Sequence, residues 1–175
     1  AVISFKNNGA KVERVAMKKD GLDLKELEGI LKRDKIKFIY TAATFHNPTG
    51  ISISEKKRVE LLDLAEKYNF YIIEDDCSSD IYFDEKKIRS IKSYDKNDRV
   101  IYIKSYSKVF MPGFRLGFMV APEKIANSVL AGKYSSDISN SGLNQRVFQY
   151  FLENGIWNEH IEKSRKEFHK KQKYM

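Results

Sequence analysis

Short apolar runs of strand length alternate with helix-like segments along most of this 175-residue chain. The strand-like runs are Val12–Met17, Ile36–Ala43, Phe70–Asp75, Val100–Lys104 and Phe114–Val120. Strands separated by helices predict a mostly parallel sheet with helices on both faces. The sequence therefore predicts an α/β fold, and the short connection before the last run also allows a hairpin with the run before it.

The helical segments have recognisable first turns. Asp23–Glu26 has the form of a capping box, and Ser54 is an N-cap candidate for a second helix. Residues 123–175 are mainly helical in pattern, with breaks at Gly142 and Gly155. Apolar side chains recur at helical spacing, namely Leu24, Leu27 and Leu31 in the first helix and Leu61, Leu62, Ala65 and Tyr68 in the second.

Polar residues follow two of the apolar runs. His46–Gly50 is a turn signature, which places Asn47 just past the second run, and Asp75-Asp76 ends the third. Ligands of open α/β sheets bind outside the carboxyl ends of the strands. A carboxylate there can keep a pyridine nitrogen protonated, and an amide can donate to a phenolic oxygen on the same ring. Taken alone, the first feature is an ordinary turn and the second a solvated strand end.

A lysine flanked by hydroxyls follows the fourth run. It is Lys108 in Ser105-Tyr106-Ser107-Lys108, and Arg115 follows seven residues later. A lysine amine can condense with the aldehyde of pyridoxal 5'-phosphate (PLP), while serines and a guanidinium hold its phosphate. A surface-loop lysine is the ordinary interpretation of this motif alone. The order amide, carboxylate, lysine, arginine on successive strand ends favours a PLP site.

These motifs resemble the fold-type I PLP-dependent enzymes of the aspartate aminotransferase superfamily. The closest resemblance is to the aminotransferase-like domain of MocR-type GntR-family transcription regulators. It is carried by His46–Gly50, Ile73–Asp76, Val100–Lys108, Leu116–Pro122 and the helical stretch Gln145–Lys173. It implies that residues 1–175 are part of an aminotransferase large, PLP-binding domain, truncated at both ends. Residues 123–175 would lead toward a small domain outside the chain.

The resemblance also assigns roles to residues. Lys108 would form the internal aldimine and Asp75 would meet the pyridine nitrogen, which makes these two the catalytic candidates. The cofactor-binding candidates are Asn47 at the ring oxygen, Asp75, Lys108, and Ser105, Ser107 and Arg115 at the phosphate. Asp76 is expected to face neighbouring backbone or solvent. Strand alternation places Lys104, the nearest competing lysine, beside the serine loop.

The pattern departs from the family just after Asp75. Regulators of this kind usually have tyrosine two residues after the aspartate, and free-standing aminotransferases have it three residues after. Here these positions hold Cys77 and Ser78. A thiol is a much weaker donor than a phenol, so the resemblance does not carry tuned transamination over to this chain.

Three functions remain open on these residues. The first is an effector-sensing PLP domain of a regulator, which binds an amino compound, forms a homodimer and meets DNA only through segments outside this chain. The second is a free-standing aminotransferase that transfers an amino group between an amino acid and a 2-oxo acid. The third is an aminotransferase-fold remnant that no longer binds PLP.

Composition and charge bear on three questions: DNA contact, metal binding and cellular compartment. The formal net charge is +8, but basic residues are mixed with acids, and we interpret the basic stretch Lys163–Lys173 as a solvated helix face rather than a DNA contact. His46, His160 and His169 lack metal-ligand spacing, so no metal site is expected. A single cysteine and the lack of a membrane-length apolar run are compatible with a reducing cytoplasm.

Overall fold

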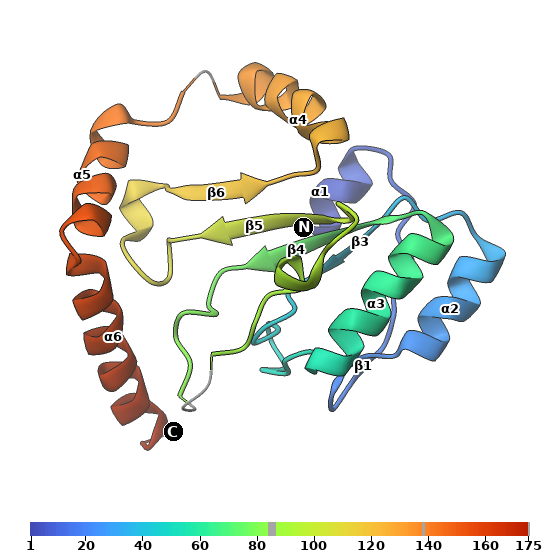
Figure 1. Ribbon diagram of the computed structural model, residues 1–175, viewed down its shortest axis with the longest axis horizontal. Helices are drawn as coiled ribbons and strands as arrows, with labels where there is room; N and C mark the ends of the chain where they lie inside the picture. Colours follow the sequence, from blue (N-terminus) through green and yellow to red (C-terminus); the bar gives the residue numbers. More distant parts are fainter. Residues whose placement is uncertain (84–86, 138, 175) are drawn as a thin grey trace.

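The computed structural model describes residues 1–83, 87–137 and 139–174. Helices and strands alternate through the first two thirds of the chain, and helices alone follow (Figure 1). The elements are α1 (Val2–Asn7), β1 (Met17–Lys18), β2 (Gly21–Leu22), α2 (Leu24–Arg33), β3 (Phe38–Thr41), α3 (Glu55–Tyr68), β4 (Tyr71–Asp76), η1 (Lys92–Tyr94), β5 (Val100–Ser105), η2 (Pro112–Phe114), β6 (Gly117–Val120), α4 (Glu123–Ser136), α5 (Gly142–Glu153) and α6 (Ile156–Gln172).

A four-stranded sheet in the order β3-β4-β5-β6 forms the centre of the fold. β3, β4 and β5 are parallel, and β6 pairs with β5 in the antiparallel sense. The mostly parallel sheet and the hairpin are therefore confirmed. In the β4–β5 register, Asp75 lies opposite Ile103 and Asp76 lies opposite Lys104.

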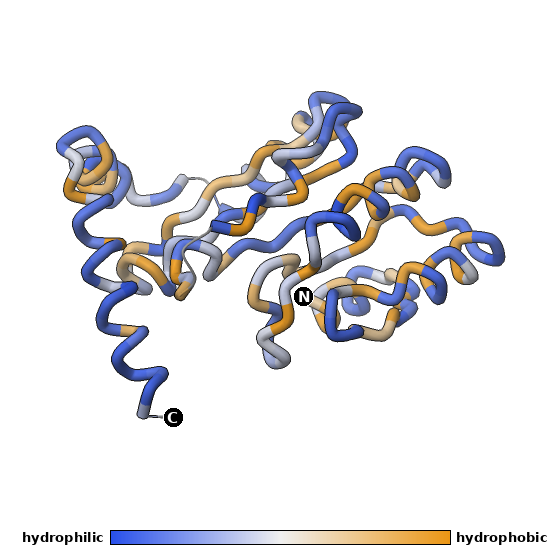
Figure 2. Tube along the Cα trace, turned by 60° about the horizontal axis from the view of Figure 1, so that its bottom comes forward, coloured by the Kyte–Doolittle hydropathy of each residue, from blue (hydrophilic) through white to orange (hydrophobic). Residues whose placement is uncertain are grey.

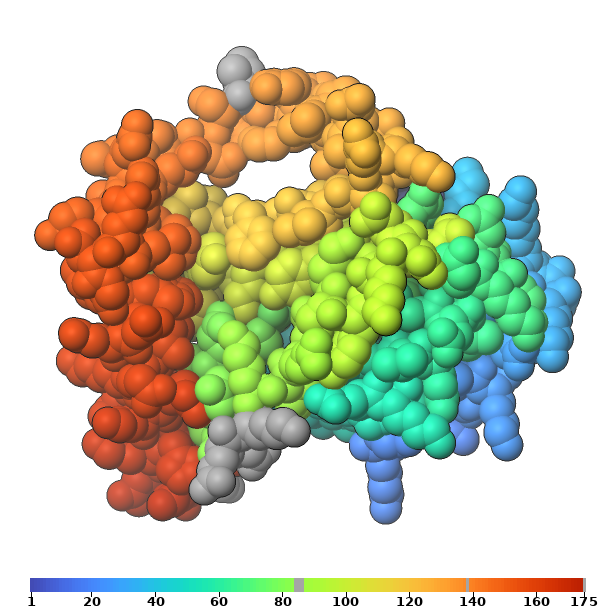
Figure 3. All heavy atoms as spheres, viewed as in Figure 1, coloured from blue at the N-terminus to red at the C-terminus, as the bar shows by residue number. Residues whose placement is uncertain are grey.

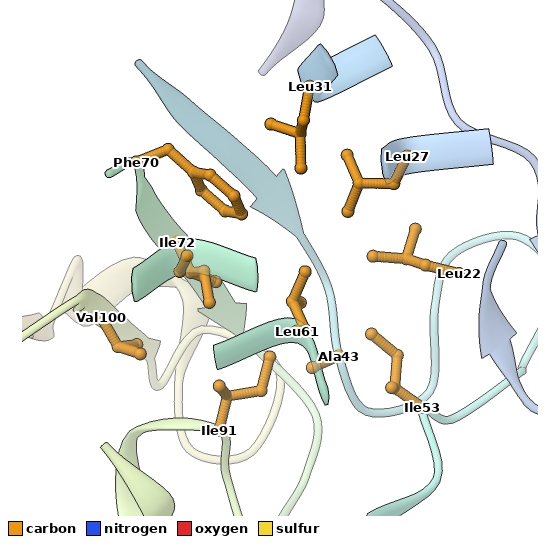
Figure 4. Close-up of a cluster of buried hydrophobic side chains, with 11 residues drawn as sticks. Leu22, Leu27, Leu31, Ala43, Ile53, Leu61, Phe70, Ile72, Ile91 and Val100 are labelled. Carbon is orange, nitrogen blue, oxygen red and sulfur yellow. The ribbon is translucent and has the colours of Figure 1, made fainter. Parts of the chain in front are cut away.

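Helices lie against both faces of this sheet. On one face, Leu61 and Ala65 of α3 pack with Ile72 and Val100 in the main apolar core (Figure 4). On the other face, the Phe5 ring of α1 contacts the rings of Phe38 and Tyr40. The remaining core members come from α2 and the connecting loops: Leu22, Leu27, Leu31, Ala43, Ile53, Phe70 and Ile91. Along the chain, hydrophobic and hydrophilic stretches alternate through the sheet and its covering helices (Figure 2).

A buried arginine fastens α3 to the sheet. Arg58 is fully buried and donates to the carbonyls of Ile53 and Ala43. Its guanidinium also lies 3.5 Å from the Glu74 carboxylate of β4, which accepts two backbone N–H groups from the loop at Ile91. Burial raises the pKa of Glu74 despite these partners. The network fixes the loop after β3 and the segment before β5 around the same point of β4.

The helix caps follow the sequence closely, with one exception. The Asp23 side chain accepts from the backbone N–H groups of Lys25 and Glu26, and the Ser54 hydroxyl accepts from Lys57. The Glu26 carboxylate does not complete a capping box, because it accepts from the backbone N–H of Ala16 instead. The prediction of a reciprocal box was therefore half wrong.

The predicted strand Val12–Met17 is wrong for most of its length. Only Met17 and Lys18 form ladder pairs, with Leu22 and Gly21. The backbone N–H of Ala16 is satisfied by a side chain, and its carbonyl accepts from the backbone N–H of Asp23. The segment therefore runs along the start of α2 rather than beside a strand.

The helix breaks predicted at Gly142 and Gly155, in the helical region 123–175, are present in the structure. Gly142 is the first residue of α5, and Gly155 precedes α6 with a left-handed φ of 72°. α5 and α6 stand along the carboxyl ends of β4 and β5, while α4 lies beyond the exposed strand β6 (Figures 1 and 3). Basic residues of α6 are largely exposed, and two of them pair with acids of the same helix. None of the described helices combines the length and apolarity needed to cross a membrane.

Candidate cofactor site

Except for Asn47, which follows β3, the candidate residues lie at or just beyond the carboxyl ends of β4 and β5. Side chains alternate between the faces of a strand, so Asp75, Ile103 and Ser105 share one face of the sheet. Asp76 and Lys104 lie on the opposite face of the sheet, and both are buried. The pleat thus separates two adjacent acids into two different environments.

Asp75 has a phenol as its partner. The Tyr40 hydroxyl of β3 donates to a carboxylate oxygen of Asp75. Burial, and then this hydrogen bond, raise the pKa of Tyr40, so the phenol stays protonated and remains a donor. Sequence reasoning missed Tyr40. Its signal appears only in the register, where Tyr40 pairs with Ile73 and so lies on the face of Asp75.

Lys108 lies in a tight turn directly after β5. The backbone N–H groups of Val109 and Phe110 both donate to the carbonyl of Tyr106, at 3.3 and 2.8 Å. Lys108 is exposed, whereas Val109 next to it is buried. The turn therefore presents the lysine at the surface from an anchored backbone.

The structure brings the two serines and Arg115 together. The Arg115 guanidinium lies 3.4 Å from the Ser107 hydroxyl, and the backbone N–H of Ser107 donates to the Ser105 hydroxyl at 3.4 Å. Arg115 follows η2 in a left-handed conformation, with φ 53° and ψ 44°. A non-glycine residue in this region is uncommon and is held there by its surroundings.

Two amides of the helical end support this conformation. The Asn144 side chain donates to the carbonyl of Phe114 at 3.2 Å, and the Asn140 side chain donates to the carbonyl of Arg115 at 3.4 Å. Both residues were missed by sequence reasoning, because they lie 25 to 30 residues downstream with no local motif. Asn144 of α5 thus holds the residue before Arg115, and Asn140, which precedes α5, holds Arg115 itself.

Asn47 forms no hydrogen bond with this group in the described part of the chain. It lies exposed in the turn after β3, where the backbone N–H of Gly50 donates to the carbonyl of His46 at 2.7 Å. No hydrogen bond within the described ranges links Asn47 to Asp75, Lys108 or Arg115. The structure therefore places it at the predicted strand end without joining it to the other candidates.

Asp76 is buried and faces neighbouring backbone and side chains. It is 6% exposed, so the solvent alternative is wrong, while the backbone alternative holds because the backbone N–H of Ser79 donates to Asp76 at 3.0 Å. Asp76 also accepts from the side chains of Ser79, Tyr102 and Lys104. Burial acts to raise the pKa of Asp76, but Lys104 and the two hydroxyls outweigh it and hold the pKa below its usual value. The Lys104 amine lies 3.1 Å from Asp76 and 2.7 Å from Asp80. Lys104 thus forms a buried ion cluster with Asp76 and Asp80.

A cavity of about 340 Å³ opens beside this cluster. Its walls include the cluster itself and the aromatic side chains of Tyr106, Phe118 and Trp157. It lies on the Asp76 face of the sheet, opposite the face that carries Asp75. None of the candidate cofactor residues lines this cavity.

Cys77 occupies the position where the family pattern has a phenol. Its side chain is partly buried, with the sulfur 4.0 Å from the Ser78 hydroxyl. No hydrogen bond from Cys77 to Asp75 or to the lysine turn occurs among the described residues. The hydroxyl that reaches Asp75 comes from β3 instead.

Comparison with known proteins identifies similar regulators and aminotransferases. Residues 2–175 match the family profile of aminotransferases of class I and II. The chain is 40% identical to the HTH-type transcriptional regulator YcxD of Bacillus subtilis over 146 residues, which is 83% of this chain and 33% of YcxD. It is 31% identical to aromatic-amino-acid aminotransferase 1 of Thermococcus litoralis over 168 residues, which is 93% of this chain and 40% of that enzyme.

Solved structures agree with the fold. The multiple substrate aminotransferase of Thermococcus profundus superposes with a TM-score of 0.90 at 30% identity, over 94% of this chain and 42% of that one. LysN, the α-aminoadipate aminotransferase of Thermus thermophilus, complexed with N-(5'-phosphopyridoxyl)-L-leucine, gives 0.87 at 31% identity, over 93% of this chain and 42% of that one. The chain spans about a third to two fifths of the length of these relatives. By its sequence and its fold, the chain belongs to the class I and II aminotransferase family.

Proposed function

We propose that this chain is the PLP-binding part of a transcription regulator and responds to an amino compound. PLP, when bound, supplies an aldehyde that captures amines and a ring that withdraws electrons. Lys108 would attach covalently to the aldehyde, and Asp75 would hold a proton at the ring nitrogen. Asn47 would contact the ring oxygen, and Ser105, Ser107 and Arg115 would hold the phosphate.

The donor set supports this assignment. Two hydroxyls and a guanidinium lie within hydrogen-bond reach of one another beside the lysine turn. In the described ranges Arg115 forms no ion pair with a carboxylate, so its charge is free for an anion. Arginine and hydroxyl donors suit a phosphate dianion, because a guanidinium donates two parallel hydrogen bonds and keeps its charge.

The other end of the site suits a pyridine ring. One oxygen of Asp75 is occupied by the Tyr40 hydroxyl, which fixes the carboxylate at the strand end. A carboxylate positioned in this way can keep a ring nitrogen protonated. The observation that carries the proposal is this pairing of a fixed carboxylate on β4 with a cationic hydroxyl cluster at β5, on the same face and edge of the sheet.

The assignment of Lys108 can be tested directly. The complete protein is incubated with PLP, reduced with borohydride and digested, and the pyridoxyl group is located by mass spectrometry. We expect the group on Lys108, and we expect Lys108→Ala to lose both the fixed group and the visible absorption band. Lys124→Ala removes an exposed lysine of α4 and should behave like the wild type. A fixed group on Lys104, or an absorption band that survives in Lys108→Ala, would show the assignment to be wrong.

The regulatory role rests on the relatives. Several relatives at 31 to 40% identity are HTH-type transcriptional regulators, including YcxD and YdfD of Bacillus subtilis and NorG of Staphylococcus aureus. Cys77 and Ser78 also remove the phenol that transamination favours. An effector that binds one of two conformations more tightly would shift their populations and thereby alter DNA binding by a segment outside this chain.

An electrophoretic binding assay tests that role. The complete protein loaded with PLP is titrated against DNA from upstream of its own gene, with and without a panel of amino acids and amines. At least one amine should change the apparent DNA affinity, and Lys108→Ala should abolish that change without abolishing DNA binding. Unchanged affinity across the panel would count against the effector role.

A second function is favoured by the solved neighbours, which are aminotransferases with TM-scores up to 0.90. In that case the complete protein would convert bound cofactor to its amine form with an amino acid, and a 2-oxo acid would reverse the change over many cycles. Sustained turnover with no DNA binding would contradict the regulatory proposal and support the enzyme. A single slow half-reaction would support the regulatory proposal.

A further inference from the structure

The turn that carries Lys108 is held from outside the sheet by α6. The imidazole Nε2 of His160 lies 2.8 Å from the carbonyl oxygen of Val109, the residue directly after Lys108. A carbonyl only accepts, so Nε2 carries the proton and donates this hydrogen bond. The two partners are 51 residues apart in the sequence, and the contact joins the last helix to the lysine turn.

The imidazole is confined by aromatic rings. Its centroid lies 5.9 Å from the Phe110 ring in an edge-on arrangement and 6.1 Å from the Trp157 ring. Trp157 in turn meets the Tyr106 ring edge-on at 5.5 Å, at the other end of the turn. Because His160 is partly buried between these rings, its Nε2 has a fixed direction.

The turn itself depends on few internal contacts. Its hydrogen bonds run from Val109 and Phe110 to Tyr106, so the Val109 carbonyl has no role in closing it. That carbonyl belongs to a residue that is 2% exposed, where an unpaired acceptor is costly. His160 satisfies the carbonyl and sets the orientation of the peptide next to Lys108.

We propose that His160 is a positioning residue that aims Lys108 at the cofactor aldehyde by holding the Val109 carbonyl. The inference rests on the proposed PLP site. It adds that α6, which contributes none of the predicted cofactor contacts, controls the covalent step through one hydrogen bond. His160 is not among the predicted cofactor contacts, and its effect would pass through the backbone of the turn.

Two PLP-related ligands distinguish a loss of Lys108 positioning from a general disruption of the binding site. Pyridoxine 5'-phosphate has the ring and phosphate but no aldehyde, so its dissociation constant reports on the noncovalent contacts alone. PLP adds the attachment step, whose rate is followed by absorbance after mixing with the complete protein. If His160 positions Lys108, removing its donor should slow attachment on the order of tenfold or more, because small displacements of a reacting group have large kinetic effects. The dissociation constant of pyridoxine 5'-phosphate should change by less than about threefold.

The informative variants are His160→Gln, His160→Asn and His160→Leu. A glutamine amide can reach about as far as Nε2 and should keep the attachment rate near that of the wild type. The shorter asparagine and the apolar leucine should both be slow. His169→Asn is the matched control, because His169 lies on the same helix and contacts the Phe83 ring, away from the turn.

The outcomes are distinguishable. Wild-type protein that gives no pyridoxyl group on Lys108 defeats the proposed function itself. Wild-type attachment at Lys108, with equal rates in His160→Gln and His160→Asn, overturns the role of His160 alone. If His160→Leu does not fold, the glutamine and asparagine pair decides the question, with thermal unfolding measured for both. Slow attachment in His169→Asn would also contradict the inference.

Discussion

At the residue scale, the adjacent side chains Asp75 and Asp76 at the end of β4 have different partners and lie on opposite faces of the sheet. Asp75 faces the candidate cofactor edge and accepts from Tyr40, while Asp76 lies in the buried cluster with Lys104. The same alternation separates Ser105 from Lys104 on β5. Substitutions one position apart should therefore produce different kinds of defect.

Asp75→Asn should leave the fold intact and damage the chemistry. The amide cannot hold a proton on the ring nitrogen, so exchange of the α-hydrogen of a bound amino acid should fall by about 10²-fold or more. The measurement is NMR of amino-acid α-hydrogen exchange in D₂O with the PLP-loaded complete protein. Asp76→Asn, compared well below its unfolding temperature, should change this rate much less. Equal losses in the two variants would mean that Asp75 was assigned wrongly.

Asp76→Asn should instead lower stability in a pH-dependent way. At neutral pH we expect a loss of about 2–3 kcal/mol, less than for a wholly unpaired buried charge because Asp80 still faces Lys104. The folded-state pKa of Asp76 lies below its unfolded value, so the stabilisation is present above about pH 4 and is lost as pH falls through the folded pKa. Urea unfolding from pH 7 to pH 3 should show the two proteins converging only below about pH 4. A constant difference down to pH 3 would contradict this sign.

Cys77→Tyr tests whether this side chain can reach the ring oxygen. A phenol that donates there would favour the unprotonated lysine–cofactor linkage and lower the pKa of the visible chromophore by on the order of one unit. Spectrophotometric pH titration of the PLP-loaded complete protein measures this shift. Ser78→Tyr is the matched variant for the position used by free-standing aminotransferases. Titration curves identical to the wild type in Cys77→Tyr would leave Cys77 a packing role only.

At the element scale, the hairpin of β5 and β6 brings Arg115 back to the serine segment that follows β5. Ser105 pairs with Gly117, so the chain between them folds back and returns Arg115 to Ser107. The close approach depends on Gly117, where an added Cβ would lie 2.6 Å from the carbonyl oxygen of Lys104. α5 then holds the returning segment through Asn144.

Gly117→Ala should therefore weaken the hairpin. We expect a loss of about 1–3 kcal/mol in the free energy of unfolding, because the backbone of β5 cannot yield without disturbing its pairing with β4. Gly113→Ala is the control, since a Cβ there meets nothing within 4 Å. Chemical denaturation of both variants measures the difference. Equal stabilities would show that β6 can move away from β5 at little cost.

At the scale of the whole molecule, the sheet edge and the helical end act together. The Trp157 ring of α6 meets Tyr106 of the lysine turn, Asn144 of α5 bonds Phe114 of η2, and Asn140, just before α5, bonds Arg115. Several large apolar side chains of α4 and α5 remain exposed, among them Tyr134, Leu143 and Tyr150. Exposed apolar surface of this kind is typical of regions that meet other protein segments.

We expect the complete protein to be a homodimer. The aromatic content of 13% and the exposed apolar side chains of the helical end suit a large buried interface. Light scattering at micromolar concentration, with PLP bound, measures the molar mass. A monomeric mass under these conditions would refute the expectation.

Much of the local structure was predictable. Asp23 and Ser54 cap their helices because short polar side chains satisfy free N–H groups within the same turn. β4 and β5 were predicted to within a residue or two, since buried parallel strands are nearly continuous apolar runs. The strand prediction at Val12–Met17 failed because a strand needs a partner, and pairing is not encoded in a single segment.

The sequence by itself determined the α/β alternation, the strand ends that carry polar groups, and the serine–lysine–arginine motif, because each depends on residues close together in the chain. Only the tertiary structure decided that Tyr40 bonds Asp75, that Lys104 is committed to Asp76, and that His160 holds Val109. These partners lie 28 to 51 residues apart. Their meeting depends on strand register, on the pleat and on the packing of α6, which involve the whole chain at once.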